Sequence, residues 1–127
     1  MRLRPDQANE DSFRHFGREA VSLLDKRDLQ SLADRFGYAL TVDRSPLAAI
    51  EGDFQDCLVQ FHASARHPSV SPSTTVKYFE PNTAKLFALV ECVFTTLEGC
   101  PILAELIVTS SGEDKHITLE EISLVTA

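Results

Sequence analysis

Tryptophan is absent from this sequence of 127 residues, methionine occurs once, and glycine occurs only five times. With so few glycines there is no glycine-rich loop to cradle a phosphate, which argues against a nucleotide site. The longest apolar stretch, residues 86–97, is interrupted by Glu91 and is far shorter than the roughly 20 residues of a membrane span. Residues 1–10 lack the apolar segment of a secretory signal. The sequence therefore predicts a soluble, cytoplasmic protein that does not contact membranes.

Cysteine is scarce and poorly spaced for chemistry. Cys57, Cys92 and Cys100 are odd in number and form no Cys-x-x-Cys pair, so neither a disulfide framework nor a zinc site is indicated. Cys57 falls on the apolar side of an expected helix and Cys92 on an apolar strand face, where cysteine acts as a small hydrophobe. Cys100 lies at an expected turn and is predicted to be the most accessible of the three.

Motifs of catalysis and metal binding are also missing. The chain has no Gly-x-Ser-x-Gly elbow, and its four histidines lack the His-x-x-x-His spacing of a helical metal site. Asp53 and Asp56 lie three residues apart, but no glycine-centred calcium loop surrounds them. No cofactor and no metal are therefore predicted, although a catalytic group assembled only in the fold stays open.

Negative charge is concentrated in the second part of the chain. Residues 1–44 carry eight Lys or Arg against eight Asp or Glu, whereas residues 45–127 carry four against eleven, so the whole net charge of −7 lies there. Without a basic stripe and with a pI near 5.0, the chain is not expected to bind nucleic acid. A basic protein is the partner that this charge indicates.

Apolar spacing predicts three helices in the first half. The first covers residues 11–25. The second follows Asp28 as its N-cap and ends at Gly37, which suits the left-handed conformation at a helix end. Ser45 and Pro46 form a cap and first-turn pair that starts a third helix, reaching about residue 63.

The second half reads as antiparallel strands. A short strand is expected over residues 38–42, and a proline-rich and serine-rich loop over 67–75 separates the helical half from the strands. Four further strands are expected, at residues 75–80, 84–96, 101–110 and 116–125. The length fits one domain over residues 1–127, with residues 1–10 as a flexible N-terminus.

The side chains select the register of the central hairpin. A three-residue loop, Leu97 to Gly99 with Gly99 left-handed, makes paired residue numbers sum to 196. One face of the hairpin is then wholly apolar, whereas a two-residue turn would bury Glu105 beside Cys92. We therefore favour the three-residue loop.

This register places Glu91 directly opposite Glu105 on the second face. Facing carboxylates are unfavourable unless one is protonated, a cation bridges them or both meet water. Three interpretations stay open: solvent exposure, a pocket or interface, or an error of register. In the last strand, the apolar positions change parity between Leu119 and Ile122, which a bulge at Glu120 and Glu121 would reconcile.

The order of elements resembles the NTF2-like, or cystatin-like, α+β cone, in which N-terminal helices pack on a curved antiparallel sheet, here of about four strands. The resemblance extends over residues 11–125, through the segments 11–40, 45–61 and 86–125. It implies an open pocket inside the cone, which some members use to isomerise or dehydrate small molecules. No catalytic pair of the family can be placed on residues of this chain.

Two functions follow. The first is a non-catalytic acidic protein that binds a basic protein, similar in size and charge to immunity proteins that neutralise toxin domains, through the rim acids Glu51, Asp53, Asp56, Glu113, Asp114, Glu120 and Glu121. The second is a pocket protein that binds or converts a small molecule with Glu91 or Glu105 as general base, in a pocket lined by Tyr78, Phe87, Leu89, Val93 and Leu103. A homodimer that covers the apolar second face is compatible with both.

Overall fold

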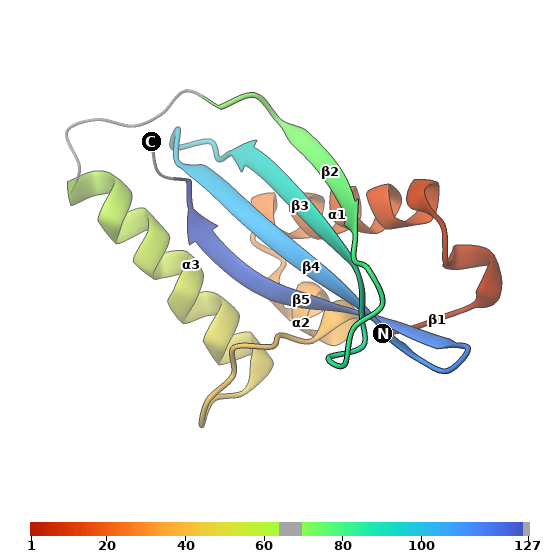
Figure 1. The fold of residues 1–127 in the computed structure, drawn as a ribbon. Helices are drawn as coiled ribbons and strands as arrows, with labels where there is room; N and C mark the ends of the chain where they lie inside the picture. Colours follow the sequence, from red (N-terminus) through yellow and green to blue (C-terminus); the bar gives the residue numbers. More distant parts are fainter. Residues whose placement is uncertain (64–69, 126–127) are drawn as a thin grey trace.

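The computed structural model describes residues 1–63 and 70–125. Three helices precede most of the sheet: α1 (Glu10–Asp25), α2 (Leu29–Phe36) and α3 (Pro46–Ala63). A 3-10 turn, η1 (Pro5–Gln7), precedes α1. The strands are β1 (Arg2–Leu3), β2 (Ser73–Tyr78), β3 (Leu86–Thr95), β4 (Pro101–Ser111) and β5 (Asp114–Leu124). Helices packed on an antiparallel sheet confirm the α+β class (Figure 1).

The helices begin and end where the sequence predicts. Asn9 accepts a hydrogen bond from the backbone N–H of Ser12 at 2.9 Å and so caps α1. The helix begins at Glu10, one residue before the predicted start. Asp28 caps α2, and Gly37 follows that helix with φ of 68°. The side-chain oxygens of Asn9 and Asp28 each satisfy an N–H group that a helix leaves unpaired. No helix within residues 1–63 and 70–125 is long and apolar enough to cross a membrane.

The sheet has the order β1-β5-β4-β3-β2, all antiparallel. In the central hairpin Glu91 pairs with Glu105, the backbone N–H of Thr96 donates to Cys100 O at 3.0 Å, and Gly99 has φ of 88°. The three-residue loop and its register are therefore confirmed. The loop predicted for residues 67–75 lies partly outside the described residues.

The predicted bulge in the last strand is also confirmed. Glu105 pairs with Glu121, whereas the next residue of β4, Leu106, pairs with Leu119, which leaves Glu120 as the extra residue. The extra residue lets Leu119 and Ile122 both face the helices despite their different parity.

The N-terminus and the segment before α3 differ from the sequence prediction. Residues 1–10, expected to be flexible, include β1, which pairs with β5 and buries Leu3. The strand predicted for residues 38–42 was wrong: the segment makes one backbone bond to the sheet, from Ala39 N to Leu119 O at 2.9 Å. Burial of Tyr38, and not a strand ladder, fixes this segment.

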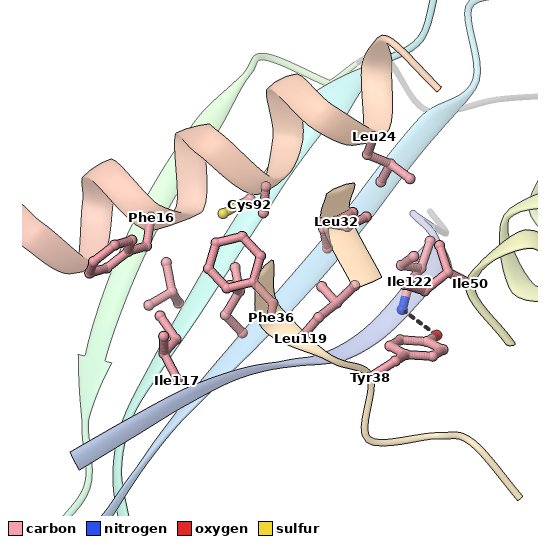
Figure 2. Packing of buried hydrophobic residues seen from close by; sticks show 14 of the residues in the cluster. Phe16, Leu24, Leu32, Phe36, Tyr38, Ile50, Cys92, Ile117, Leu119 and Ile122 are labelled. Atoms are coloured by element: carbon pink, nitrogen blue, oxygen red, sulfur yellow. Dashed lines mark hydrogen bonds between the residues drawn. The ribbon is translucent and has the colours of Figure 1, made fainter. Parts of the chain in front are cut away.

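The core fills the space between the helices and one face of the sheet (Figure 2). Phe16, Leu24 and Leu32 of the helices point onto Cys92, Leu119 and other strand residues. Helix α1 lies very close to the sheet at Gly17, where a Cβ atom would be 2.7 Å from Cys92 Sγ. Burying a large apolar side chain contributes about 1.5–3 kcal/mol, so this face of the sheet supplies most of the apolar stabilisation.

Candidate functional site

The second face of the sheet, here called the open face, is not covered by a helix in the described part of the chain. In Figure 1, α1 and α2 lie behind the sheet and α3 runs beside β5. Over residues 88–94 of β3 and 102–108 of β4, buried and partly buried residues alternate. The partly buried set, which forms the open face, comprises Leu89, Glu91, Val93, Leu103, Glu105 and Ile107.

A row of glutamates crosses this face at the middle of the strands. Glu91 pairs with Glu105, and Glu105 pairs with Glu121. Directly opposite residues of an antiparallel pair have Cβ atoms about 4.5–5.5 Å apart, so three carboxylates lie on adjacent strands. Glu120, the bulge residue, adds a fourth. We call Glu91, Glu105, Glu120 and Glu121 the glutamate row.

Apolar side chains border the glutamate row on both sides along the strands. Val93 pairs with Leu103 on one side, and Leu89 pairs with Ile107 on the other. All four are partly buried, although the helices of the described residues lie mainly on the other side of the sheet (Figure 1). The row therefore lies in an apolar surround, as the register predicted.

One lysine neutralises part of the row. Lys77 Nζ of β2 lies 2.5 Å from Glu91 Oε1. Of the seven ion pairs among residues 1–63 and 70–125, none includes Glu105, Glu120 or Glu121. Burial raises the pKa of Glu105, and the negative charges of Glu121, Glu91 and Glu120 raise it further. Ionisation of Glu105 is thus opposed by its own neighbours.

The sequence missed the role of Lys77. The sequence feature that could have revealed this role is the alternation in β2, where Thr74 and Val76 face the helices and Thr75 and Lys77 face the other way. Pairing of Thr75 with Glu91 brings Lys77 within reach of the row. The pairing of β2 with β3 could not be fixed from the sequence, because part of the loop before β2 carries no turn signal of defined length.

At the β5 end, the glutamate row continues toward α3. Glu121, Asp53 and Asp56 line one groove of about 250 Å³ between α3 and β5. Glu51 and Asp56 are exposed residues of α3. Of the seven predicted rim acids, Asp53, Asp56 and Glu121 therefore share one groove and Glu120 adjoins it in β5, whereas Glu51 is not among the residues that line it.

Asp53 is held within the fold and is not a free rim charge. Tyr38 Oη donates to Asp53 Oδ2 at 2.6 Å, and Arg44 Nη1 lies 3.4 Å from Asp53 Oδ1. The same hydroxyl accepts from the backbone N–H of Ile122 at 3.2 Å. Burial raises the pKa of Tyr38, as does its hydrogen bond to Asp53. The network fastens α3 and residues 38–44 to β5 beside the bulge.

Glu113 and Asp114 lie elsewhere, at the hairpin between β4 and β5. Asp114 Oδ1 accepts a hydrogen bond from Arg2 Nη2 at 2.8 Å. Arg2, Arg4 and Lys115 share a groove with these two acids. The structure therefore does not join this pair to the acidic region beside α3, and the local charge here is mixed.

The predicted pocket residues are divided between the two faces. Phe87 is an extra residue where the pairing of β3 with β4 shifts. Its ring contacts Phe13 of α1 edge-on, with ring centres 6.1 Å apart, and contacts Tyr78 in the same way at 5.7 Å. Tyr78 and Phe87 thus lie on the helix side, whereas Leu89, Val93 and Leu103 lie on the open face. The structure does not bring these five residues together.

The cysteines lie in the core. Cys57 and Cys92 are buried as predicted, but the expectation that Cys100 is accessible was wrong: its exposure is 0%. Helix α3 covers the turn, and Cys100 Sγ contacts Cys57 O at 3.9 Å. Burial raises the pKa of Cys57 to about 11 and that of Cys92 to about 11, which leaves both as unreactive thiols at neutral pH.

The described residues contain no group of three or more His, Cys, Asp or Glu side chains arranged to hold a metal ion. The glutamate row is therefore extended along the sheet and does not converge on a point. Comparisons with family models, with curated proteins and with solved structures found no match to this chain. Geometry and charge are accordingly the basis of the functional proposal.

Proposed function

We propose that this chain is a non-catalytic acidic binding protein that associates with a basic protein. The observation that supports this function best is the glutamate row on a sheet face that no helix of residues 1–63 and 70–125 covers (Figure 1). Apart from the Lys77–Glu91 ion pair, these carboxylates have no ion-pair partner among residues 1–63 and 70–125, and facing like charges destabilise a sheet. Cationic side chains of a basic partner would pair with these carboxylates and offset the repulsion between them.

The net charge of −7 supports the same proposal at longer range. The rim acids Asp56, Glu120 and Glu121 form a negative field beside the groove between α3 and β5. Such fields raise the rate at which an oppositely charged protein arrives, and salt screens them beyond about 8 Å at physiological ionic strength.

Two finer statements belong to the proposal. The order of helices and strands supports a relation to the NTF2-like cone, and the size and acidity support a role like that of immunity proteins, which neutralise a basic toxin domain. Fold alone does not determine function. The buried residues between helices and sheet form an apolar core, and a groove of about 410 Å³ lies between α1 and strands β2 and β3. Neither includes Glu91 or Glu105, which favours surface binding by these two residues over an internal ligand site.

Affinity capture from the source organism's lysate at low and at physiological salt tests the function. We expect a basic protein to be retained at low salt, and the purified protein to bind directly with a dissociation constant that rises steeply with salt. A partner held only by a salt-insensitive apolar contact, or no partner at either salt, would contradict the proposal.

The alternative function is a small-molecule site at Glu91 and Glu105. The raised pKa of Glu105 favours it, since general bases are tuned in this direction. In that case Glu91→Gln abolishes binding or turnover of the small molecule while the fold is retained. Unchanged activity in the folded variant would remove this alternative.

A further inference from the structure

The open face has the composition of a binding surface. Leu89 and Ile107 lie on one side of the glutamate row, and Val93 and Leu103 lie on the other. Sheets with apolar residues on both faces generally have both faces covered. In the part of the chain that the structure describes, the helices cover one face only (Figure 1), so a second protein surface is the natural cover for the other.

Charge determines what that cover can be. A second copy of this chain, related by a twofold axis, would present the same patch to itself, and the glutamate rows would meet in a poorly solvated interface. Burying unpaired carboxylates costs several kcal/mol each. A partner surface that places a cation at this position would instead pair with these carboxylates and so offset the cost of burying them.

The chain itself shows how a cation sits here. Lys77 approaches from the β2 side and reaches Glu91 at 2.5 Å, while its side chain remains 63% exposed. Glu105, one strand further in, has no ion-pair partner among the residues that the structure describes. A second cation, arriving from outside the sheet, would face Glu105 and Glu91 from above.

We infer that the open face binds a segment of the basic partner that places an arginine side chain over Glu91 and Glu105, with aliphatic side chains on either side. This inference rests on the proposed function and specifies its contact. A guanidinium is planar, carries five donors and is weakly hydrated, so it suits two carboxylates within an apolar surround better than an ammonium does. The flanking aliphatic side chains would cover Leu89 and Ile107 on one side and Val93 and Leu103 on the other.

Binding in this mode depends on pH, because the guanidinium pairs with ionised Glu105. Glu91, Glu120, Glu121 and Lys77 are the charged groups that act on Glu105, and the three carboxylates raise its pKa beyond the effect of burial. An added guanidinium lowers that pKa. Acidic conditions that protonate Glu105 therefore weaken binding, and the complex releases protons when it forms there.

Two measurements test the inference. The first repeats the capture at low salt with three variants of the full chain that each remove two charges: Glu91→Gln with Glu105→Gln on the open face, Glu51→Gln with Asp56→Asn on α3, and Asp11→Asn with Glu80→Gln as a matched control. The second titrates acetyl-Val-Arg-Val-amide, and its neutral citrulline analogue, into isotopically labelled protein and follows backbone amide shifts.

We expect the open-face variant to weaken the captured partner at least about tenfold, because charge-assisted hydrogen bonds are lost, and the matched control to change it less than about twofold. The arginine peptide should shift amides of β3 and β4, and the citrulline analogue should not. Equal weakening by all three variants, or the largest loss on α3, would overturn the inference and leave the proposed function standing.

Other outcomes also decide. If the wild-type chain captures no protein, the proposed function fails, and the peptide titration alone decides whether the open face prefers a guanidinium. Backbone amide shifts that are equal for the arginine peptide and its citrulline analogue, or that occur mainly on α3, would overturn the inference. A doubled molecular mass by light scattering, abolished by Leu103→Ala, would show that a second copy covers the face instead.

Discussion

The two faces of this sheet are built from the same strands but respond to different surroundings. Along β3, Val90 and Cys92 are fully buried against the helices, and Glu91 between them points to the open face. Side chains on the helix face are set by packing, whereas those on the open face are free to carry charge that the fold does not need. The contrast teaches that the two-residue period of the strand separates the side chains that stabilise the core from the side chains to which we assign the proposed binding.

The sharpest test of this separation uses two leucines of β4. Leu106 has 0% exposure on the helix face, and Leu103 is partly buried on the open face. Leu106→Ala should lower the free energy of unfolding by about 2–5 kcal/mol, because a cavity forms in a packed core. Leu103→Ala should cost less than about 1.5 kcal/mol. Chemical denaturation of both variants measures the difference; equal losses would show that the open face is covered in solution.

Tyr38 tests the boundary between the faces, where the acidic region meets the core. Tyr38→Phe removes the acceptor of the Ile122 N–H and the hydroxyl donor of Asp53. A buried group left without its partner costs about 1–3 kcal/mol. Tyr78→Phe is the control, since Tyr78 is 52% exposed and should change stability by less than about 0.5 kcal/mol. Equal denaturation midpoints for the two variants would contradict the network.

Gly17 tests how tightly the helix face is closed. In Gly17→Ala the added carbon would lie 2.7 Å from Cys92 Sγ and 3.0 Å from Val90 Cγ1. Overpacking costs about 1–3 kcal/mol, which outweighs the gain of about 1 kcal/mol for alanine in a helix. Gly52→Ala on α3 is the control, because its new carbon would meet only the end of the Arg44 side chain, and it should be neutral or stabilising. Thermal unfolding compares them.

Much of the fold could be predicted because local rules agreed with one another. The caps at Asp28 and Gly37, the three-residue loop ending at Gly99 and the bulge at Glu120 each follow from the residue types at those positions. The Glu91 and Glu105 pair followed from the register once the buried face was required to be apolar. The alternation of apolar and charged residues along the strands therefore predicted most of the candidate site.

The remaining features depend on contacts between distant segments. Nothing local distinguishes the pairing of β1 with β5, or the use of Tyr38 as a buried anchor in place of a strand residue. Phe87 was predicted to line a pocket with Leu89, Val93 and Leu103, but it is itself the extra residue in β3, and its ring contacts Phe13 on the helix side. Cys100 is covered by α3, which a turn signal cannot reveal. One-residue shifts and long-range packing therefore set the limit of prediction.

The smallest effect, and the one specific to the open face, is a difference in stability that depends on pH. The pKa of Glu105 is raised in the folded state by burial and by Glu121, Glu91 and Glu120. The folded protein then holds this proton more tightly than the unfolded chain, whose glutamates titrate near pH 4.3. The contribution of Glu105 to stability therefore falls as the pH rises from about 4.3 through the raised pKa of the folded state. Glu105→Gln should therefore stabilise the protein at neutral pH by about 0.2–1 kcal/mol, as expected for relief of like charges across strands.

Glu98→Gln provides the opposite case. Its own backbone N–H and the Arg27 guanidinium hold the pKa of Glu98 below its usual range, so ionised Glu98 stabilises the fold, and this stabilisation is lost as the pH falls through the lowered pKa. Denaturation at pH 7 should rank Glu105→Gln above the wild-type chain and Glu98→Gln below it, and the three should converge as both carboxylates protonate. Destabilisation by Glu105→Gln at pH 7 would mean that the row holds a cation in the free protein, and the open face would then be occupied before any partner arrives.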